Sequence, residues 1–396
     1  MKVLFVVPYV PSTIRVRPYN FIKELAQHHD VTVVATATAR EAAGAAGLEE
    51  LGARVELVPI RPATALMSCA AAALRGDPLQ AAVCMSPALD RRLRELVATG
   101  GFDVVHVEHL RGAAARASIP AHIPTVFDAV DSISLLWERT LAASTSLRQH
   151  VLARLELQRT RRFEGLIVRR FDRVAVTSAV DAKRLQELAP GAELTVVPNG
   201  VDLEYFSVQG CAREPATLVF SGKMSYHANV TAVRHFVDAI LPLVRQQRPD
   251  VQLRIVGSSP PQEIVDLARD PAISVTGYLP DIREAIRGAT VAICPVTVKV
   301  GVQNKVLEAM ALGLPVVCSA VGFEGLAAEP DQDLLVANSP SEFAADVVRL
   351  LDDADLRRRL SAAGRRYVES HHRWSAATAQ LEGLYQEAID RHRVPA

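Results

Sequence analysis

Residues 298–317 read VKVGVQNKVLEAMALGLPVV, which contains a loop with a glycine, a helical pattern and the start of an apolar strand. The apolar run VAICP, residues 291–295, comes just before this stretch. We therefore expect a strand, a loop, a helix ending at Gly313 and a second strand, in that order. Parallel strands joined by a helix form the repeating unit of a doubly wound α/β sheet.

Short apolar runs alternate with helical patterns along the whole chain. Examples are KVLFVV, DVTVVAT and FDVVHVE in the first half, and ATLVFSG, VQLRIVG and PVVCSA in the second half. Continuous apolar runs of this kind predict parallel sheets that helices cover on both faces. A turn signal at 198–200, followed by a polar stretch, predicts a linker at about 190–215. The sequence therefore predicts an α/β fold with two Rossmann-like, doubly wound domains, over residues 1–190 and 200–372.

The composition excludes several classes of protein. The 44 basic and 44 acidic residues cancel, so no overall charge attracts the chain to nucleic acid. No stretch of about 20 apolar residues predicts a transmembrane helix, and the opening MKVLFVVPYVPS is better interpreted as a buried strand than as a signal peptide. The five cysteines lie in apolar runs without a CxxC pair, which indicates buried thiols. We expect a cytoplasmic protein.

An arginine-rich segment departs from the neutral average. Between 139 and 173 there are nine arginines (139, 148, 154, 159, 161, 162, 169, 170 and 173) against Glu156, Glu164 and Asp172. Interleaved with apolar residues at helical spacing, they favour peripheral contact with the inner face of an anionic membrane, or binding of an acidic acceptor. The alternative is a solvated helical face whose arginines pair with local acids.

The residues that follow the predicted strands are candidates for a ligand site. Helix N-termini at the carboxyl ends of parallel strands present amide hydrogens and positive charge to a ligand. Gly222 permits close approach of the backbone, and Lys223 adds a cation suited to a diphosphate; a solvated loop lysine is the alternative. The motifs GxGxxG, GxxxxGK[ST] and GxSxG are absent, which counts against dinucleotide oxidoreductases, P-loop kinases and α/β-hydrolases.

Glu308 is the acidic candidate of this site. It is predicted within about the first turn of the helix in 298–317, where a carboxylate can accept two hydrogen bonds from a vicinal diol such as ribose. Lys305 lies three residues earlier on the same face, so it and the loop amides would face phosphates. Alternatively, Glu308 merely complements the helix dipole and pairs with Lys305.

Several segments together resemble the retaining glycosyltransferases of GT-B fold, family 4. They are NKVLEAMALGLPVVCSAVGFEGL, VVPNGVD, LRIVGSSP, VTGYLPD and HRWSAATAQLEGLY. The match covers nearly all of 190–380 and is looser before that. The resemblance implies two domains facing an interdomain cleft, with the donor on the C-terminal domain, the acceptor on the N-terminal domain, and a last helix, about 375–396, that crosses back to the first domain. It also implies transfer of a sugar from a nucleotide diphosphate sugar, UDP- or GDP-linked, to a carbohydrate or lipid-linked acceptor of polysaccharide or glycolipid biosynthesis, with no cofactor.

The resemblance also assigns roles to residues. Glu308 matches the second glutamate of the E-x7-E signature, and Lys223 matches a basic residue that steadies the leaving diphosphate. Lys223, Lys305 and Glu308 are the expected catalytic residues. The expected donor contacts are Gly222, Lys223, Tyr278, Leu279, Gly301, Val302, Gln303, Asn304, Lys305 and Glu308. Two positions depart from the family: Val300 replaces the first glutamate, which holds donor-sugar hydroxyls, and Asn229 replaces a second basic residue, whose charge Lys305 is expected to restore.

The N-terminal half offers candidate acceptor contacts. Arg15 and Arg17 follow the first strand and are expected to contact a phosphate, unless they are ordinary surface arginines. His109, Asp128 and Asp131 follow later strands and complete this set. His106, Glu108 and His109 have alternate spacing, but they lack a further ligand cluster, and Asp331 and Asp333 are predicted in a turn. We therefore expect no metal site.

Two other functions remain open for the sequence. A GT-B epimerase or hydrolase of nucleotide sugars would need acid and base groups around the donor sugar, and Val300 counts against it. A non-catalytic nucleotide-sugar-binding subunit is compatible with both departures from the family pattern. For a transferase, the resemblance implies attack of the acceptor on the same face as the leaving diphosphate, without an enzymic nucleophile.

Overall fold

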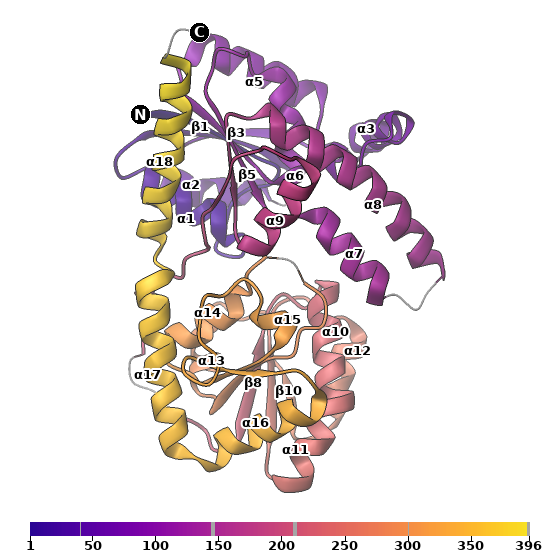
Figure 1. Ribbon diagram of the computed structural model, residues 1–396, viewed down its shortest axis with the longest axis vertical. Coiled ribbons are helices and arrows are strands. Elements are labelled where there is room, and N and C mark those ends of the chain that lie inside the picture. The colour runs from indigo at the N-terminus through magenta and orange to yellow at the C-terminus, as the bar shows by residue number, and fades with distance from the viewer. Residues whose placement is uncertain (40, 144–146, 209–211, 300, 394–396) are drawn as a thin grey trace. The chain divides into compact units, whose positions relative to one another are not determined.

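The computed structural model describes residues 1–39, 41–143, 147–208, 212–299 and 301–393 (Figure 1). The chain forms two compact units. Unit 1 contains Met1–Pro198 and the chain from Trp374 onward, and unit 2 contains Asn199–Arg373. Among the described residues, no helix is long and apolar enough to cross a membrane.

Unit 1 is built on a seven-stranded parallel sheet of order β3-β2-β1-β4-β5-β6-β7. Its strands are β1 (Lys2–Val7), β2 (Asp30–Ala37), β3 (Arg54–Pro59), β4 (Val104–Glu108), β5 (Thr125–Val130), β6 (Arg173–Val176) and β7 (Leu194–Val196). Its α-helices are α1 (Val16–Leu25), α2 (Ala46–Glu49), α3 (Pro62–Arg75), α4 (Leu79–Ala82), α5 (Pro87–Gly100), α6 (His109–Gly112), α7 (Ile133–Ala143), α8 (Leu147–Ile167), α9 (Ala179–Leu188) and α18 (Trp374–Arg393). The opening segment forms the buried strand β1, as its apolar pattern predicts.

Unit 2 repeats this plan with six parallel strands of order β10-β9-β8-β11-β12-β13. The strands are β8 (Thr217–Ser221), β9 (Gln252–Val256), β10 (Ile273–Val275), β11 (Val291–Cys294), β12 (Val316–Ser319) and β13 (Leu335–Ala337). The α-helices are α10 (His227–His235), α11 (Leu241–Gln247), α12 (Gln262–Val265), α13 (Arg283–Arg287), α14 (Asn304–Ala311), α15 (Ala320–Phe323), α16 (Pro340–Asp352) and α17 (Ala354–His371). The predicted α/β fold with two Rossmann-like units is confirmed.

The strand order determines where a ligand can bind. In each sheet the chain runs outward in one direction and then in the other, so the order reverses at β1/β4 in unit 1 and at β8/β11 in unit 2. Ligands of doubly wound sheets bind at the carboxyl ends of the strands beside such a reversal. The loops that follow β8 and β11 are therefore the candidate ligand site of unit 2.

The last helix, α18, belongs to the core of unit 1. Trp374, Leu381 and Tyr385 are buried in the same apolar cluster as β1 and β2. The Tyr385 hydroxyl lies 3.0 Å from Nδ1 of His106, which is fully buried within β4 and stacks on Phe5. His106 thus has a packing role inside the sheet.

Candidate active site

Two glycines bring the ends of β8 and β9 into contact. A Cβ atom on Gly257 would lie 1.8 Å from the carbonyl oxygen of Gly222, so no side chain fits there. A Cβ atom on Gly222 would lie 2.8 Å from Nδ2 of Asn229 and 3.3 Å from Cε of Lys305. The end of β8 therefore touches the start of α10 and the first turn of α14, as expected at a point of strand reversal.

Lys305 is held between neutral partners. Its ammonium group donates hydrogen bonds of 3.0 Å to Oδ1 of Asn229 and to Oε1 of Gln303, and it lies 5.2 Å from the centroid of the Phe220 ring. Asn229 in turn donates to the carbonyl oxygen of Lys223 at 2.9 Å. Since amide oxygens do not neutralise an ammonium group, Lys305 keeps its positive charge beside Asn229, the position where the resembling family has a basic residue.

Glu308 lies on the half-buried face of α14. The sequence suggested a position within about the first turn of the helix. Because the helix begins at Asn304, Glu308 lies in the second turn. Its carboxylate forms no ion pair with Lys305, and within the described part of the chain it has no hydrogen-bond partner. Burial raises the pKa of Glu308 to about 7, although Lys305 lowers it. A purely structural pair with Lys305 is therefore not what the geometry shows.

A buried lysine holds the loop before α14 through hydrogen bonds to backbone carbonyl oxygens. Lys299 is buried, and its ammonium group donates to the carbonyl oxygens of Gly301 and Glu324. Gly301 has a φ of 64°, a left-handed conformation that suits glycine, and Val302 is buried. Asn304 accepts a 3.0 Å hydrogen bond from Nδ2 of Asn199. Val300, where the family has its first glutamate, lies outside the described residues.

Lys223 and Tyr278 reach solvent. Lys223 follows Gly222 in the loop after β8, its side chain is exposed, and its ammonium group has no ion-pair partner in the part of the chain that the structure describes. Tyr278 is 70% exposed, whereas Leu279 packs partly against the core of unit 2. Of these two expected donor contacts, only Tyr278 has most of its side chain exposed.

Tyr205, Asp281 and Arg283 form a cluster of polar side chains in unit 2 that the sequence patterns do not indicate. The guanidinium group of Arg283 lies 4.1 Å from the centroid of the Tyr205 ring and forms a 2.5 Å ion pair with Asp281. Arg283 lowers the pKa of Asp281 to about 2. Burial, Asp281 and also Glu308 raise the pKa of Tyr205, so Tyr205 lies within electrostatic range of Glu308.

In unit 1, Arg17 and Asp128 form a buried ion pair. Nε of Arg17 lies 2.7 Å from Oδ2 of Asp128, and Arg17 also donates to the carbonyl oxygen of Val197 at 2.9 Å. Both side chains are buried. Arg17 is therefore not a surface arginine. Arg15 is more exposed, pairs with Glu41 at 2.6 Å and stacks over the Tyr9 ring.

The ends of β4 and β5 carry further candidate groups. Glu108 is fully buried and accepts a 2.9 Å hydrogen bond from the Tyr9 hydroxyl. Burial and Asp128 raise the pKa of Glu108 to about 8, so this carboxyl is mostly protonated at neutral pH. His109 has a left-handed φ of 63°, and burial lowers its pKa to about 3. Asp131 accepts a 2.9 Å hydrogen bond from the Thr177 hydroxyl.

The acidic residues near 331 form a turn, as predicted. Asp331 has a φ of 63°, and the carboxylate of Asp333 accepts a 2.9 Å hydrogen bond from the amide of Glu329. Among the described residues there is no group of three or more histidine, cysteine, aspartate and glutamate side chains that could hold a metal ion.

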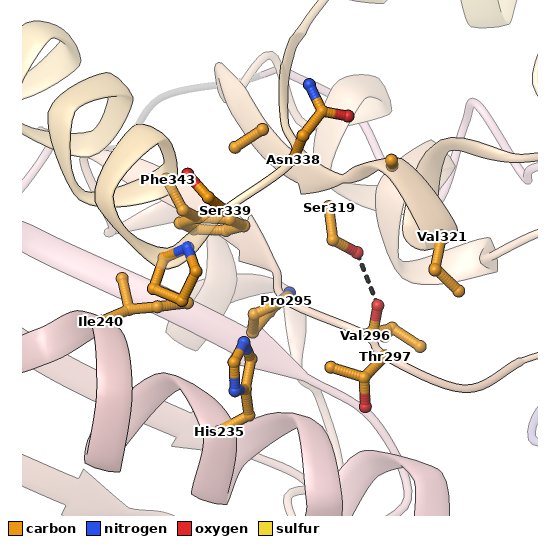
Figure 2. A pocket seen from close by; sticks show the side chains of 13 residues that line it. His235, Ile240, Pro295, Val296, Thr297, Ser319, Val321, Asn338, Ser339 and Phe343 are labelled. Atoms are coloured by element: carbon orange, nitrogen blue, oxygen red, sulfur yellow. Dashed lines mark hydrogen bonds between the residues drawn. The ribbon is translucent and has the colours of Figure 1, made fainter. Parts of the chain in front are cut away.

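A separate hollow opens at the ends of β11, β12 and β13. Figure 2 shows His235, Phe343, Pro295 and Asn338 around it. The Ser319 hydroxyl donates a 2.6 Å hydrogen bond to the carbonyl oxygen of Val296, which joins the loop after β11 to the end of β12 (Figure 2). None of the predicted donor contacts lines this hollow.

Comparison with known proteins identifies the family. Residues 12–200 match the model of the glycosyl transferase 4-like domain, and residues 215–353 match that of the glycosyl transferases group 1. The chain is 27% identical to a phosphatidyl-myo-inositol mannosyltransferase of Mycobacterium tuberculosis, over 83% of this chain and 87% of that protein.

Two further similarities concern a more distant relative and a solved structure. The chain is 26% identical to a GDP-mannose:cellobiosyl-diphosphopolyprenol alpha-mannosyltransferase of Xanthomonas oryzae, over 57% of this chain and 60% of that protein. Its fold matches the crystal structure of Anabaena HepE in complex with UDP, with a TM-score of 0.70, 14% identity and coverage of 98% and 100%. The chain belongs to the family 4 glycosyltransferases of GT-B fold.

Proposed function

We propose that the chain transfers a hexose from a nucleotide diphosphate sugar to a lipid-linked acceptor, with retention of the anomeric configuration. The observation that carries this proposal is the pairing, on α14, of a half-buried carboxylate that has no partner among the described residues with a lysine held by two neutral amides. Glu308 would accept hydrogen bonds from the ribose, and Lys305 would face the diphosphate. A buried structural ion pair would not leave both charges available.

The residues at the end of β8 support the chemistry of the leaving group. As the bond between the anomeric carbon and the diphosphate oxygen breaks, negative charge grows on the phosphate oxygens. Lys223, which is exposed, and Lys305 would stabilise that charge, together with the amides of the loop before α14. The acceptor hydroxyl would attack on the same face and pass its proton to the departing phosphate.

The base and the sugar are proposed from the relatives. One relative is named as a transferase of mannose from GDP-mannose, and a protein of the same fold was solved with UDP. GDP-mannose is therefore the first donor to test, and UDP-sugars are the second. The ring of Tyr278 and the stacked pair of Tyr205 and Arg283 are the groups we propose for contact with the base and ribose.

The acceptor is proposed to bind to unit 1. Arg15 and His109 stand after β1 and β4, and they are the residues that we propose for direct contact. Arg17 and Asp128 neutralise one another in the interior, so we assign them the role of holding the loop after β1 in place. Asp131, which already accepts from Thr177, would orient the start of α7.

Exposed apolar and basic side chains support a membrane-bound acceptor. On α8, Val151, Leu152, Leu155 and Leu166 are each more than half exposed. On α3, Leu66, Met67 and Leu74 are exposed by 73%, 65% and 91%. Side chains of both helices, Ser68 and Ala71 of α3 and Phe163 of α8, line one groove. We call these seven apolar residues the α3–α8 patch.

Some arginines of 139–173 pair with acids, and others are exposed and could contact an anionic membrane. Arg159, Arg161 and Arg173 pair with acids, as the solvated-face alternative expects. Arg154, Arg162, Arg169 and Arg170 are exposed and form no ion pair within the described residues. Basic side chains beside exposed leucines fit the headgroups and acyl chains of an anionic lipid surface.

The test of the donor site is nucleotide binding followed by turnover. Calorimetric titration with GDP and UDP should detect binding of one of them, and Glu308→Gln should weaken it at least tenfold. Glu284→Gln, which changes an exposed carboxylate of α13, should leave the affinity unchanged. Binding without sugar transfer to any polyprenyl-diphosphate or inositol-lipid acceptor would favour a non-catalytic subunit. No binding of either nucleotide would contradict the proposal.

A further inference from the structure

Two buried cysteines face each other across neighbouring strands of unit 2. Cys294 is the last residue of β11 and Cys318 lies in β12, and the two are direct partners in the parallel register. Both are essentially inaccessible to solvent. Neighbouring strands are about 4.8 Å apart, and disulfides join Cα atoms at about 4.4–6.8 Å. Because the two residues are direct partners in the register, a disulfide needs little movement of the backbone.

The surroundings hold the two sulfur atoms together. The 2.6 Å hydrogen bond from Ser319 to the carbonyl oxygen of Val296 joins the two strands just beyond the cysteines (Figure 2). The amide of Gly322 donates to the same serine hydroxyl at 3.0 Å. A Cβ atom on Gly322 would lie 3.1 Å from Sγ of Cys294, so α15 closes over this sulfur.

The two thiols are not equivalent. The hydrogen bond from Cys318, together with the nearby charges of Lys305 and Lys299, lowers the pKa of Cys294 to about 7. The same pairing and burial raise the pKa of Cys318. Cys294 is therefore the more acidic of the two thiols and the better nucleophile, and Cys318 is the thiol that resolves the first product.

We propose that Cys294 and Cys318 form a reversible oxidation site that closes to a disulfide in the presence of a peroxide. The Cys294 thiolate attacks one oxygen of hydrogen peroxide, the O–O bond breaks, and the products are a sulfenic acid and hydroxide, which takes up a proton to become water. The Cys318 sulfur then attacks the sulfenic sulfur, the S–O bond breaks, and the proton of Cys318 leaves with the hydroxyl group as a second water. A small dithiol returns both residues to thiols.

Closure of this disulfide would reach the donor site, a consequence that rests on the proposed function. Cys294, Lys305, Ser221 and Val306 line one small internal cavity. The chain from Cys294 also leads through the loop fastened by Lys299 into α14. Oxidation removes the thiolate that lines this cavity with Lys305, so the ammonium group loses a nearby negative charge. Lys305 would then lose its place beside Asn229, and the diphosphate would bind more weakly.

The first experiment detects the bond itself. The full chain is reduced, exposed to hydrogen peroxide, blocked with iodoacetamide and digested, with and without dithiothreitol. The expected result is a linked peptide pair that contains Cys294 and Cys318 and disappears on reduction. The same experiment on a variant in which Cys69, Cys84 and Cys211 are changed to serine should give the same pair. Linkage only after unfolding in urea, or no linkage in either protein, would overturn the proposal.

The second experiment measures the effect on the donor. Nucleotide affinity is titrated before oxidation, after oxidation and after reduction. We expect a loss of about tenfold that dithiothreitol restores, and no loss in Cys318→Ala or Cys294→Ser, which are checked for folding by circular dichroism. Linkage with unchanged affinity would overturn the coupling to the donor site. Linkage in a protein that binds no nucleotide even when reduced would support the oxidation site and contradict the proposed function instead.

Discussion

At the scale of single residues, Glu308 combines a proposed binding role with a cost in stability. Its folded pKa of about 7 lies above the ordinary value of 4.5, so folding favours the protonated form. Below pH 4.5 the carboxyl is neutral in both the folded and the unfolded chain. Above pH 7 it is ionised in both, and the desolvated charge lowers the free energy of unfolding by its full amount. Glu308→Gln should therefore stabilise the protein by about 1–3 kcal/mol at pH 8. Thermal unfolding should show this gain shrinking as the pH falls toward 4.5.

The same group sets the pH dependence of nucleotide binding. Ribose hydroxyls donate to the ionised carboxylate, so the dissociation constant of the bound nucleotide should rise as the pH falls below about 7. The rise should approach tenfold for each pH unit. Titrations between pH 6 and pH 8 on the wild type and on Glu308→Gln measure it. An equal pH dependence in both proteins would assign the titration to another group.

Lys223 and Lys305 should have different kinetic effects. Lys223 is exposed and held by no other residue of the described chain, so Lys223→Ala should lower kcat at least tenfold through lost stabilisation of the leaving diphosphate. Lys305→Gln should in addition raise KM for the donor, because it also leaves Asn229 and Gln303 without their cation. Steady-state rates over a range of donor concentrations separate the two effects. An unchanged kcat for Lys223→Ala would exclude its proposed role.

Residue patterns predicted part of this site and missed another part. Gly222 and Lys305 could be found because each follows a recognisable strand, and the structure brings them together at the end of β8. Tyr205 and Arg283 could not, since they are 78 residues apart, in a turn before β8 and at the start of α13, and only the folded chain stacks one on the other. Arg17 was expected to contact a phosphate, or else to be a surface arginine, because its buried partner, Asp128, is distant in the sequence.

At the scale of elements, the start of α7 depends on a carboxylate from α8. Glu164 is buried and accepts a 2.6 Å hydrogen bond from the amide of Ile133. It also accepts from the amide of Ser134 and from the Ser132 hydroxyl. Burial raises the pKa of Glu164 to about 7, and these hydrogen bonds lower it only in part. An acid in the arginine-rich segment thus serves as the cap of the preceding helix.

Removal of this cap should destabilise unit 1. Glu164→Ala leaves two buried amide donors without an acceptor, which should cost about 2–4 kcal/mol. Glu164→Gln keeps one acceptor oxygen and should cost less, and Glu187→Ala, an exposed glutamate of α9, should cost almost nothing. Urea unfolding of the three variants measures these differences. A similar stability for Glu164→Ala and wild type would mean that water replaces the carboxylate.

At the scale of the whole molecule, the pattern of apolar residues predicted both sheets. It did not predict which apolar side chains of the helices are exposed to solvent. Apolar runs identify strands because a parallel sheet is buried on both faces. The pattern of α3 looks like that of any packed helix, yet only Ala72 of α3 is buried. No count of charges could show that Arg161 and Arg173 pair with acids, since their partners Glu138 and Glu387 come from other elements, whereas Arg159 pairs with Glu156 within α8.

The neutral chain should therefore bind membranes through a local surface. We expect the protein to sediment with vesicles that contain phosphatidylglycerol and much less with pure phosphatidylcholine. Each arginine near an anionic surface contributes about 1 kcal/mol, so about 0.5 M salt should weaken binding strongly. The double variants Leu66→Glu/Leu74→Glu on α3 and Leu152→Glu/Leu155→Glu on α8 should each reduce sedimentation at least tenfold.

A matched change elsewhere tests whether the α3–α8 patch is responsible. Val265→Glu alters an exposed apolar residue of α12 in unit 2 and should leave vesicle binding unchanged. All variants should bind nucleotide with wild-type affinity, because none of the substitutions lies on α14 or in the loops of the donor site. If the patch variants bound vesicles as tightly as the wild type, or if Val265→Glu lost as much binding as they did, the lipid surface would have to lie elsewhere on the chain.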